Sequence, residues 1–218
     1  MPLTANGPLI ELHTGDLPDG LILGDRVAID TETTGLIPHR DRLCLVQLTD
    51  GDGVCHLVHF SPQLRQDAGD GFYPAPNLAA LLANPETTKL FHFGRFDIGM
   101  LFLHLGVLCQ PVYCTKIASR LVRTYTDRHG LKDLCRELLG VEISKEQQSS
   151  DWGAERLSEE QMRYAATDVI HLHRLADRLE TMLVREGRDD LARACFQFLP
   201  ERARLDVSGW PGEDIFAY

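Results

Sequence analysis

Residues 27 to 36 read VAIDTETTGL, and this stretch decides how the rest of the chain is interpreted. It begins with three apolar residues typical of a buried strand, but Asp30 and Glu32 follow where more apolar residues are expected. Because side chains alternate across a strand, the two carboxylates point to the same face. Carboxylates that share a site repel each other, and a hard divalent cation such as magnesium removes that conflict. The alternative is a strand end at which both acids are solvated.

The composition is that of an acidic globular protein. The chain has 218 residues, 44% of them hydrophobic, and a formal net charge of −10. This length favours a single domain over 1–218, with a leader at about 1–24 and a C-terminal tail at about 200–218. Proteins that hold long nucleic acids by the backbone are usually basic. The negative net charge therefore disfavours a broad surface that binds duplexes, but it is compatible with a local pocket for a nucleotide.

The N-terminal stretch and the cysteines indicate the cellular compartment. MPLTANGPLIELHTGD lacks the basic start and apolar core of a secretory signal, and no apolar run is long enough to span a membrane. The six cysteines include no CxxC pair, and several lie in apolar segments. We expect reduced thiols rather than disulfides or zinc ligands, and hence a cytoplasmic protein.

The pattern of apolar residues predicts an α/β fold with a mixed five-stranded sheet flanked by helices. Three strands open the chain, the second and third joined by the hairpin signal DGDG, and two more strands follow between helices. The expected strands are 26–30, 43–49, 54–60, 89–93 and 111–115. The expected helices are 77–84, 95–106, 116–122, 131–139, 158–186 and 189–197.

Three further residues are candidates for the same site. Asp97 follows a buried strand and falls in the first turn of a helix, where the helix dipole alone also favours an acid. Tyr164 and Asp168 stand four residues apart on one face of the long helix, among alanines and aliphatic residues. A buried aspartate without a partner is costly in free energy, and a metal ion would be such a partner. Taken alone, each feature also fits a structural role.

The order of these motifs resembles the DEDD superfamily of 3′–5′ exonucleases, in its tyrosine-bearing subclass. D-x-E on a strand is followed by F-D after a later strand and by Y-x-x-x-D on a late helix. SSDWGAERLSEEQMRYAATDV is similar to the third motif of the ribonuclease D group. IDTETTGLIPHRDRLCLVQL, KLFHFGRFD and the tail FLPERARLDVSGWPGEDIFAY resemble the short NrnC branch. The resemblance implies a ribonuclease H-like exonuclease fold.

This resemblance also implies an activity. The expected protein is a 3′–5′ exoribonuclease that hydrolyses very short RNA, preferentially diribonucleotides such as pGpG, to nucleoside 5′-monophosphates. Two divalent metal ions, Mg²⁺ or Mn²⁺, would be held by Asp30, Glu32, Asp97 and Asp168, with Asp30 bridging both. Tyr164 would orient the attacking water, because an unperturbed tyrosine titrates at about pH 10 and is a poor base at neutral pH. These five residues are the expected catalytic set.

Substrate contacts are expected on either side of these acids. Thr33, Gly35 and Leu36 follow the first motif, where a glycine lets the backbone approach a ligand closely. Leu36 would wedge against the terminal base, or else it is a core residue leaving the strand. His92 and Phe93 end the fourth expected strand and are placed to contact the terminal nucleotide, although a core histidine fits equally well.

The most basic stretch of the chain, SRLVRTYTDRHGLK, has two interpretations. It is either a solvated helix face or a phosphate site beside a helix that begins at Gly130, and we expect the second. The expected contacts are Arg123, Tyr125, Arg128, His129 and Lys132. If they hold the 5′ phosphate a short distance from the metals, only very short RNA fits both ends. QQSSDW (147–152) is a further candidate for the cleft wall.

The resemblance further implies a homo-oligomer, an octameric ring, with no membrane partner. Exposed aromatic residues in the tail fit a contact between subunits, although packing on the same subunit is equally compatible. Competing functions are ribonuclease D-like trimming of longer RNA 3′ ends, single-strand DNA exonuclease activity, and a non-catalytic nucleic-acid-binding scaffold. The intact acids disfavour the scaffold, because a scaffold has no need of repelling carboxylates at one site.

Overall fold

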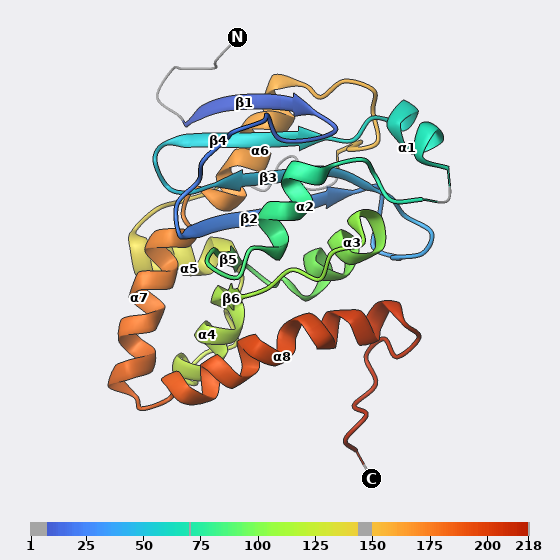
Figure 1. The fold of residues 1–218 in the computed structure, drawn as a ribbon. Helices are drawn as coiled ribbons and strands as arrows, with labels where there is room; N and C mark the ends of the chain where they lie inside the picture. Colours follow the sequence, from blue (N-terminus) through green and yellow to red (C-terminus); the bar gives the residue numbers. More distant parts are fainter. Residues whose placement is uncertain (1–7, 70, 144–149, 218) are drawn as a thin grey trace.

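The computed structural model describes residues 8–69, 71–143 and 150–217 and contains a six-stranded mixed sheet with helices around it (Figure 1). The strands are β1 (Leu9–Thr14), β2 (Arg26–Thr33), β3 (Leu43–Thr49), β4 (Val54–His59), β5 (Thr88–Phe91) and β6 (Val112–Cys114). Their order in the sheet is β1-β4-β3-β2-β5-β6. β3 runs antiparallel to β2 and β4, and the other neighbouring pairs are parallel. The predicted α/β fold class with a mixed sheet is confirmed.

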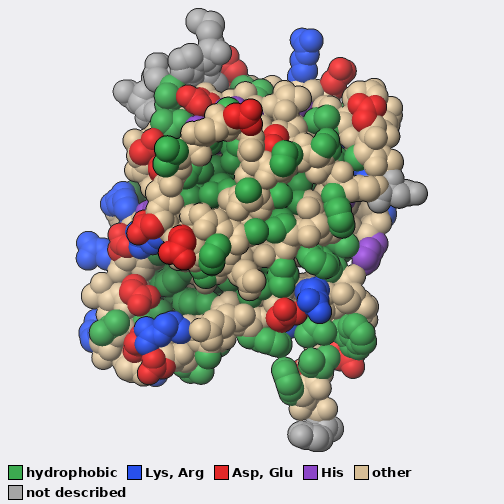
Figure 2. Space-filling view, in the orientation of Figure 1, with side chains coloured by type: hydrophobic (Ala, Val, Ile, Leu, Met, Phe, Trp, Pro, Cys, Tyr) green, Lys and Arg blue, Asp and Glu red, His purple; other side chains and the backbone are tan. Residues whose placement is uncertain are grey.

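Helices cover both faces of this sheet. They are α1 (Pro62–Ala68), α2 (Pro76–Ala83), α3 (Arg95–Leu105), α4 (Thr115–Val122), α5 (Leu131–Leu134) with the π-helical turn η1 (Cys135–Leu139), α6 (Glu159–Val169), α7 (Leu172–Arg185) and α8 (Asp189–Val207). In Figure 1, α2 crosses in front of the sheet, α6 passes behind it, and α8 runs below α3. Hydrophobic side chains cover the middle of this front face, with charged side chains mainly toward the rim (Figure 2). No helix in the described part of the chain is long and apolar enough to cross a bilayer.

The prediction of five strands misses β1, which lies inside the expected leader. β1 pairs in parallel with β4, from Leu9 opposite Val54 to Thr14 opposite His59. Ile10 is the buried residue of this strand, so the segment lacks the apolar alternation that identifies a half-buried strand. Backbone hydrogen bonding to the free edge of β4, rather than burial of side chains, makes this segment a strand.

The predicted hairpin joins β3 and β4. All seven residues of β3 are buried, which agrees with its nearly continuous apolar sequence. Gly51 and Gly53 in the turn have φ angles of 89° and 99°, a region that favours glycine. The Asp52 carboxylate accepts a hydrogen bond from the Val54 N–H at 2.8 Å and so helps to set the start of β4.

The single helix predicted over 158–186 is two helices in the structure. α6 begins with a capping box: the Ser158 hydroxyl accepts from the Gln161 N–H, and the Gln161 side chain accepts from the Ser158 N–H. The helix ends at Val169, and α7 begins at Leu172. The break lets α6 pack on β2, β3 and β4 while α7 packs on α4. Helical periodicity alone does not report this change of packing partner.

The last helix also differs from its prediction. α8 was expected over 189–197 but runs to Val207, through Pro200. Proline in a helix interior removes a backbone hydrogen bond, a loss of about 3 kcal/mol. Phe196, Leu199 and Ala203 are buried at helical spacing on both sides of the proline, and α8 packs against α3. This packing maintains the helix where local propensity predicts its end.

The six cysteines are free thiols, and five of them are buried, as predicted. Burial raises the pKa of Cys55 and of Cys109 to about 12, so these thiols stay protonated at neutral pH. They act as small core residues.

A buried lysine ties two loops to β5. The Lys89 side chain is fully buried, and its ammonium donates to the carbonyl oxygens of Asn84, Thr87 and Gln110 at 2.8, 2.7 and 2.6 Å. Because these carbonyls come from the turn before β5 and the segment before β6, the ammonium fixes β5 between its neighbours.

Replacing this ammonium tests that role. Lys89→Met keeps the apolar stem but leaves three carbonyl oxygens without their donor. We expect a loss of at least about 2 kcal/mol in the free energy of unfolding, because an unsatisfied buried polar group costs about 1–3 kcal/mol. Urea denaturation measures it. Lys132→Met, at a partly exposed position, is the matched control and should change stability by less than about 0.5 kcal/mol. Equal losses in the two variants would contradict the assignment.

Candidate active site

β2 carries Asp30 and Glu32 to one face of the sheet, next to its centre. The three residues before Asp30 are completely buried, so the strand emerges from the core only at the acids. Asp30 lies opposite Gln47 of β3, whose side-chain amide donates to Asp30 Oδ2 at 2.8 Å. A register irregularity between Glu32 and Thr33 then interrupts the pairing with β3. The strand therefore presents both acids where its regular part ends.

α6 brings Asp168 to the same place. Asp30, Glu32 and Asp168 each offer a carboxylate oxygen, and these three atoms lie within 4.8 Å of one another. Two of the acids come from a central strand and the third from a helix that packs on that strand. The site therefore depends on the packing of α6 against β2.

Asp97 adds a fourth carboxylate from the first turn of α3. It is buried, and the Thr31 hydroxyl donates to its Oδ1 at 2.5 Å. Its charge helps to raise the pKa of both Asp30 and Glu32, which places it next to the three clustered acids. Asp97 thus faces the cluster from the side of α3, held by a hydroxyl of the strand that carries the first two acids.

Tyr164 lies one turn before Asp168 on α6 and lines the same cleft. Its ring packs against Trp152, with ring centroids 6.1 Å apart. Burial, and then the negative charges of Asp168 and Glu32, raise the pKa of Tyr164 above its usual value. The phenol therefore stays protonated at neutral pH.

The acids strongly perturb one another. Burial is the largest cause that raises the pKa of Asp30 well above its ordinary value, followed by the charges of Asp97, Asp168 and Glu32. Burial and then the charges of Asp168 and Asp97 raise the pKa of Glu32 to about 9. Burial raises the pKa of Asp97 to about 6. Without a counter-charge, the site therefore holds protons that isolated carboxyl groups would release.

The donor atoms fit hard divalent cations. Within the described ranges, no ion pair joins Asp30, Glu32 or Asp97 to a basic side chain. A cluster of carboxylate oxygens without a sulfur or imidazole ligand suits Mg²⁺ or Mn²⁺. Such cations would neutralise the negative charge of the clustered carboxylates.

The acids and Tyr164 line a cleft of about 750 Å³. Six of the predicted substrate-binding residues also line it: Thr33, Gly35, Leu36, His92, Phe93 and Lys132. Leu36 and Phe93 are 80% and 51% exposed, so each presents an apolar surface in the cleft. Leu36 is therefore not a core residue, and its contact with a terminal base stays a prediction.

The comparisons with known proteins agree with this geometry. The sequence profile described as 3′–5′ exonuclease matches residues 20–184. A solved structure of Brucella melitensis NrnC bound to pGG is 54% identical, covers 96% of this chain and 98% of its own, and superposes with a TM-score of 0.87. The chain belongs to the 3′–5′ exonuclease family, in its NrnC branch. A structure of the same Brucella protein with bound Mg²⁺ has the same identity, coverage and TM-score.

Ribonuclease D proteins are further relatives of this NrnC-type chain. Ribonuclease D of Gluconacetobacter diazotrophicus is 37% identical over 164 residues, which are 75% of this chain and 39% of that protein. The chain thus spans about two fifths of the length of this and two other curated ribonuclease D relatives. The exonuclease fold and family predicted from the order of the motifs are confirmed.

The local structure explains why the NrnC-type motif carries a glycine at position 35. A Cβ atom there would lie 2.4 Å from Asp41 Oδ2, closer than real side chains approach. That carboxylate oxygen accepts a hydrogen bond from the Ile37 N–H at 2.8 Å and closes the loop after β2. Gly35 thus allows the tight loop that leaves Leu36 exposed in the cleft.

Lys116 is a cleft residue that sequence reasoning missed. It lies in the first turn of α4, directly after β6, and lines the cleft. Its ammonium lies 3.7 Å from the centroid of the Phe93 ring, a cation–π contact. Its position immediately after the last strand was a usable signal, because parallel strands end at the same edge of a sheet. Of the segment QQSSDW, Ser150 and Trp152 line the cleft, and residues 147–149 lie outside the described part of the chain.

The structure contradicts the predicted phosphate contact of Arg123. The residue is fully buried, and its guanidinium donates to Ser119 Oγ at 3.1 Å and to the Arg128 carbonyl at 2.6 Å. It also forms an ion pair with Glu137. Arg123 therefore holds the segment between α4 and α5 together, and its charge is already partnered within the protein.

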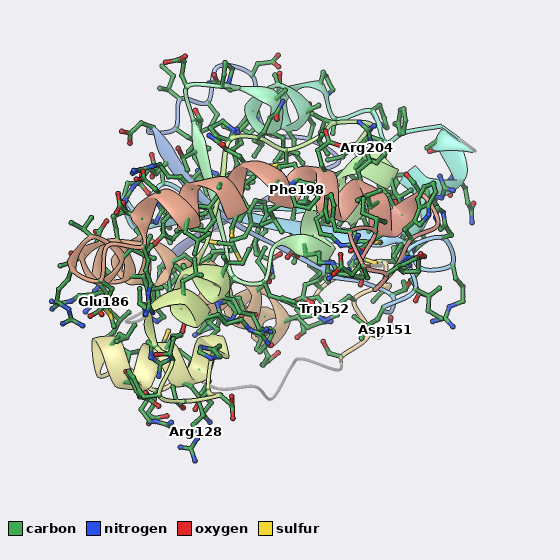
Figure 3. All side chains as sticks on the ribbon, turned by 90° about the horizontal axis from the view of Figure 1, so that it is seen from below. Arg128, Asp151, Trp152, Glu186, Phe198 and Arg204 are labelled. Carbon is green, nitrogen blue, oxygen red and sulfur yellow. The ribbon has the colours of Figure 1, made fainter. Side chains whose placement is uncertain are left out.

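Tyr125, Arg128 and His129 do not line the cleft. Tyr125 is 73% exposed, and Arg128 projects from the outer surface, away from Trp152 (Figure 3). His129 Nδ1 is hydrogen-bonded to the Ser119 hydroxyl at 2.8 Å. Sequence proximity to Lys132 suggested that these residues share its site, but the turn before α5 separates them. Their contact with substrate stays a prediction.

Replacing Glu32 by a neutral isostere, which needs no proton uptake on folding, should stabilise the protein without metal. Between about pH 4.5 and 9, the folded state retains the Glu32 proton while the unfolded chain has released it, so the stability of the chelator-treated protein falls as pH rises. Glu32→Gln abolishes this pH-dependent contribution of Glu32 to the free energy of unfolding. At pH 8 in chelator, we expect the variant to melt at least about 2–4 °C higher than the unmodified protein, which corresponds to about 1 kcal/mol.

Differential scanning calorimetry measures the effect, with Glu86→Gln at an exposed carboxylate as the matched control. Adding Mg²⁺ or Mn²⁺ should raise the melting temperature of the unmodified protein more than that of Glu32→Gln. A lower melting temperature of Glu32→Gln in chelator would show that repulsion does not dominate the site.

Proposed function

We propose that this protein is a 3′–5′ exoribonuclease that hydrolyses very short RNA, diribonucleotides above all, to nucleoside 5′-monophosphates. The observation that carries the proposal is the convergence of Asp30, Glu32 and Asp168, with Asp97 and Tyr164, in one small cleft. The 54% identical Brucella protein solved with pGG supports a dinucleotide as the occupant of such a cleft.

Asp30, Glu32, Asp97 and Asp168 would hold two divalent metal ions, Mg²⁺ or Mn²⁺. When bound, the ions supply Lewis-acid activation of water and neutralise charge on the phosphate. The Brucella relative with bound Mg²⁺ supports magnesium as one of the metals. The protein's own contribution is to hold repelling carboxylates close together, through the Gln47 amide on Asp30 and the Thr31 hydroxyl on Asp97.

Other cleft residues act on the substrate directly. The Tyr164 phenol stays protonated, so it orients the attacking water by donating a hydrogen bond. The ammonium groups of Lys116 and Lys132 place positive charge on the cleft wall, where they would hold phosphate oxygens. Leu36 and Phe93 offer exposed apolar surfaces against which bases pack.

The dimensions and charge of the protein support a short substrate. A volume of about 750 Å³ lies within the range of roughly 300–1,000 Å³ typical of small-molecule sites. Long RNA needs a basic track for its phosphates, but the chain has a net charge of −10. Binding energy is therefore concentrated on the nucleotides inside the cleft, and additional nucleotides gain little.

Competition between RNA lengths tests this function. Equimolar labelled di-, tetra- and decaribonucleotides are digested together with Mn²⁺ or Mg²⁺, and the products are resolved over time. We expect the dinucleotide to be consumed first, with at least about a tenfold higher kcat/KM, a difference of 1.4 kcal/mol in transition-state binding. Equal turnover at all lengths would favour ribonuclease D-like trimming, and preferential cleavage of single-stranded DNA would favour a DNA exonuclease.

Variants separate the chemistry from the length preference. Asp30→Ala and Asp168→Ala should abolish hydrolysis of every substrate while leaving the circular dichroism spectrum unchanged. Activity retained in either variant would contradict the metal assignment whatever the preferred length.

We further propose that the protein acts in the cytoplasm as a homo-oligomer, an octamer by its resemblance to the NrnC family. The C-terminal segment supports an assembly contact. Phe216 packs on Phe198 of α8, with ring centroids 6.0 Å apart, yet Trp210, Ile215 and Phe216 remain 45%, 45% and 67% exposed. Clustered exposed apolar side chains are typical of protein interfaces.

Sedimentation velocity tests the assembly. The full chain should sediment as an oligomer, and a chain that ends at Gly209 should sediment as a smaller species, because it lacks the exposed apolar segment. A monomeric full chain would contradict the proposed oligomer.

A further inference from the structure

A second group of potential metal ligands lies away from the active site, at the edge of the sheet formed by β1 and β4. Glu11 and His13 stand two residues apart on β1, and Glu11 pairs with His56 of β4 in the parallel register. Because side chains alternate along a strand and paired residues share a face, the three side chains point to the same side. The strand pairing alone therefore brings them together.

The donor atoms form a compact triangle. His13 Nε2 lies 3.0 Å from His56 Nδ1. Glu11 Oε2 lies 3.5 Å from His56 Nδ1 and 4.0 Å from His13 Nε2. The imidazole of His56 is 6% exposed and that of His13 is 15% exposed, whereas the Glu11 side chain is 46% exposed. The two imidazoles are thus enclosed by the protein, whereas the Glu11 carboxylate faces solvent.

These distances suit a tetrahedral metal ion. Zinc binds imidazole nitrogen at about 2.0–2.1 Å, so two ligand atoms of a tetrahedral site lie about 3.3 Å apart. The distances between the three donor atoms, 3.0, 3.5 and 4.0 Å, lie on either side of this value. Small side-chain rotations therefore bring the three atoms onto one face of a tetrahedron, with the fourth position open to solvent.

We propose that His13, His56 and Glu11 form a binding site for a zinc-class divalent cation that fastens β1 to β4. Two imidazoles and one carboxylate favour zinc over magnesium, whereas the active site offers only carboxylate oxygens. Among the described residues, β1 is an edge strand with β4 as its single partner in the sheet, so a bound ion would add a cross-link at this edge.

The test must separate this site from the catalytic acids, which also attract divalent cations. Zinc binding is therefore measured by isothermal titration calorimetry in the full chain carrying Asp30→Asn and Asp168→Asn. We expect one zinc per chain, undiminished by millimolar Mg²⁺, and a higher melting temperature with zinc.

Adding His13→Gln to that background should weaken zinc binding at least about tenfold and abolish the rise in melting temperature. Glu11→Gln, at a more exposed position, should weaken binding without disturbing the fold. His39→Gln changes an exposed histidine that does not belong to this group of ligands. It is the matched control and should bind zinc normally. Equal zinc binding by His13→Gln and His39→Gln, or no binding in the background protein, would overturn the proposal.

Discussion

Electrostatic repulsion among partly buried carboxylates at the end of β2 is the constraint around which this protein is organised. Asp30, Glu32 and Asp168 place oxygens within 4.8 Å of one another, and Asp97 adds its charge from α3. Such a cluster destabilises the folded chain unless protons or cations neutralise it. The fold tolerates it because the acids are attached to a central strand and to helices packed on the core. Divalent cations held by these acids, as proposed, would relieve this repulsion.

The chemical nature of the ligands distinguishes the two candidate metal centres. The catalytic cluster contains only carboxylate oxygens, which favour Mg²⁺ or Mn²⁺. The group on β1 and β4 combines Glu11 with His13 and His56, which favours zinc. The first centre is assembled from three elements that are distant in sequence, whereas the second requires only the pairing of two strands. The carboxylate cluster is therefore suited to catalysis, and the group on β1 and β4 is suited to anchoring a strand.

Local sequence determined a large part of this protein. The alternation of side chains places Asp30 and Glu32 on one face of their strand, and helical spacing places Tyr164 and Asp168 on one face of their helix. Both placements are independent of the tertiary structure. The DGDG turn likewise specifies a hairpin, because glycines are needed for its positive φ angles. Each of these features depends on interactions within a few residues. The order of the motifs along the chain was then sufficient to identify the exonuclease family.

Tertiary structure alone decided the remainder, because the deciding contacts join residues that are distant in sequence. Arg123 looked like a surface cation in its basic segment, but an ion pair with Glu137 holds it in the interior. The pairing partner β4, rather than its own apolar pattern, makes Leu9–Thr14 a strand and brings His13 to His56. Sequence patterns report which residues share a face, but they do not report which face another element will cover.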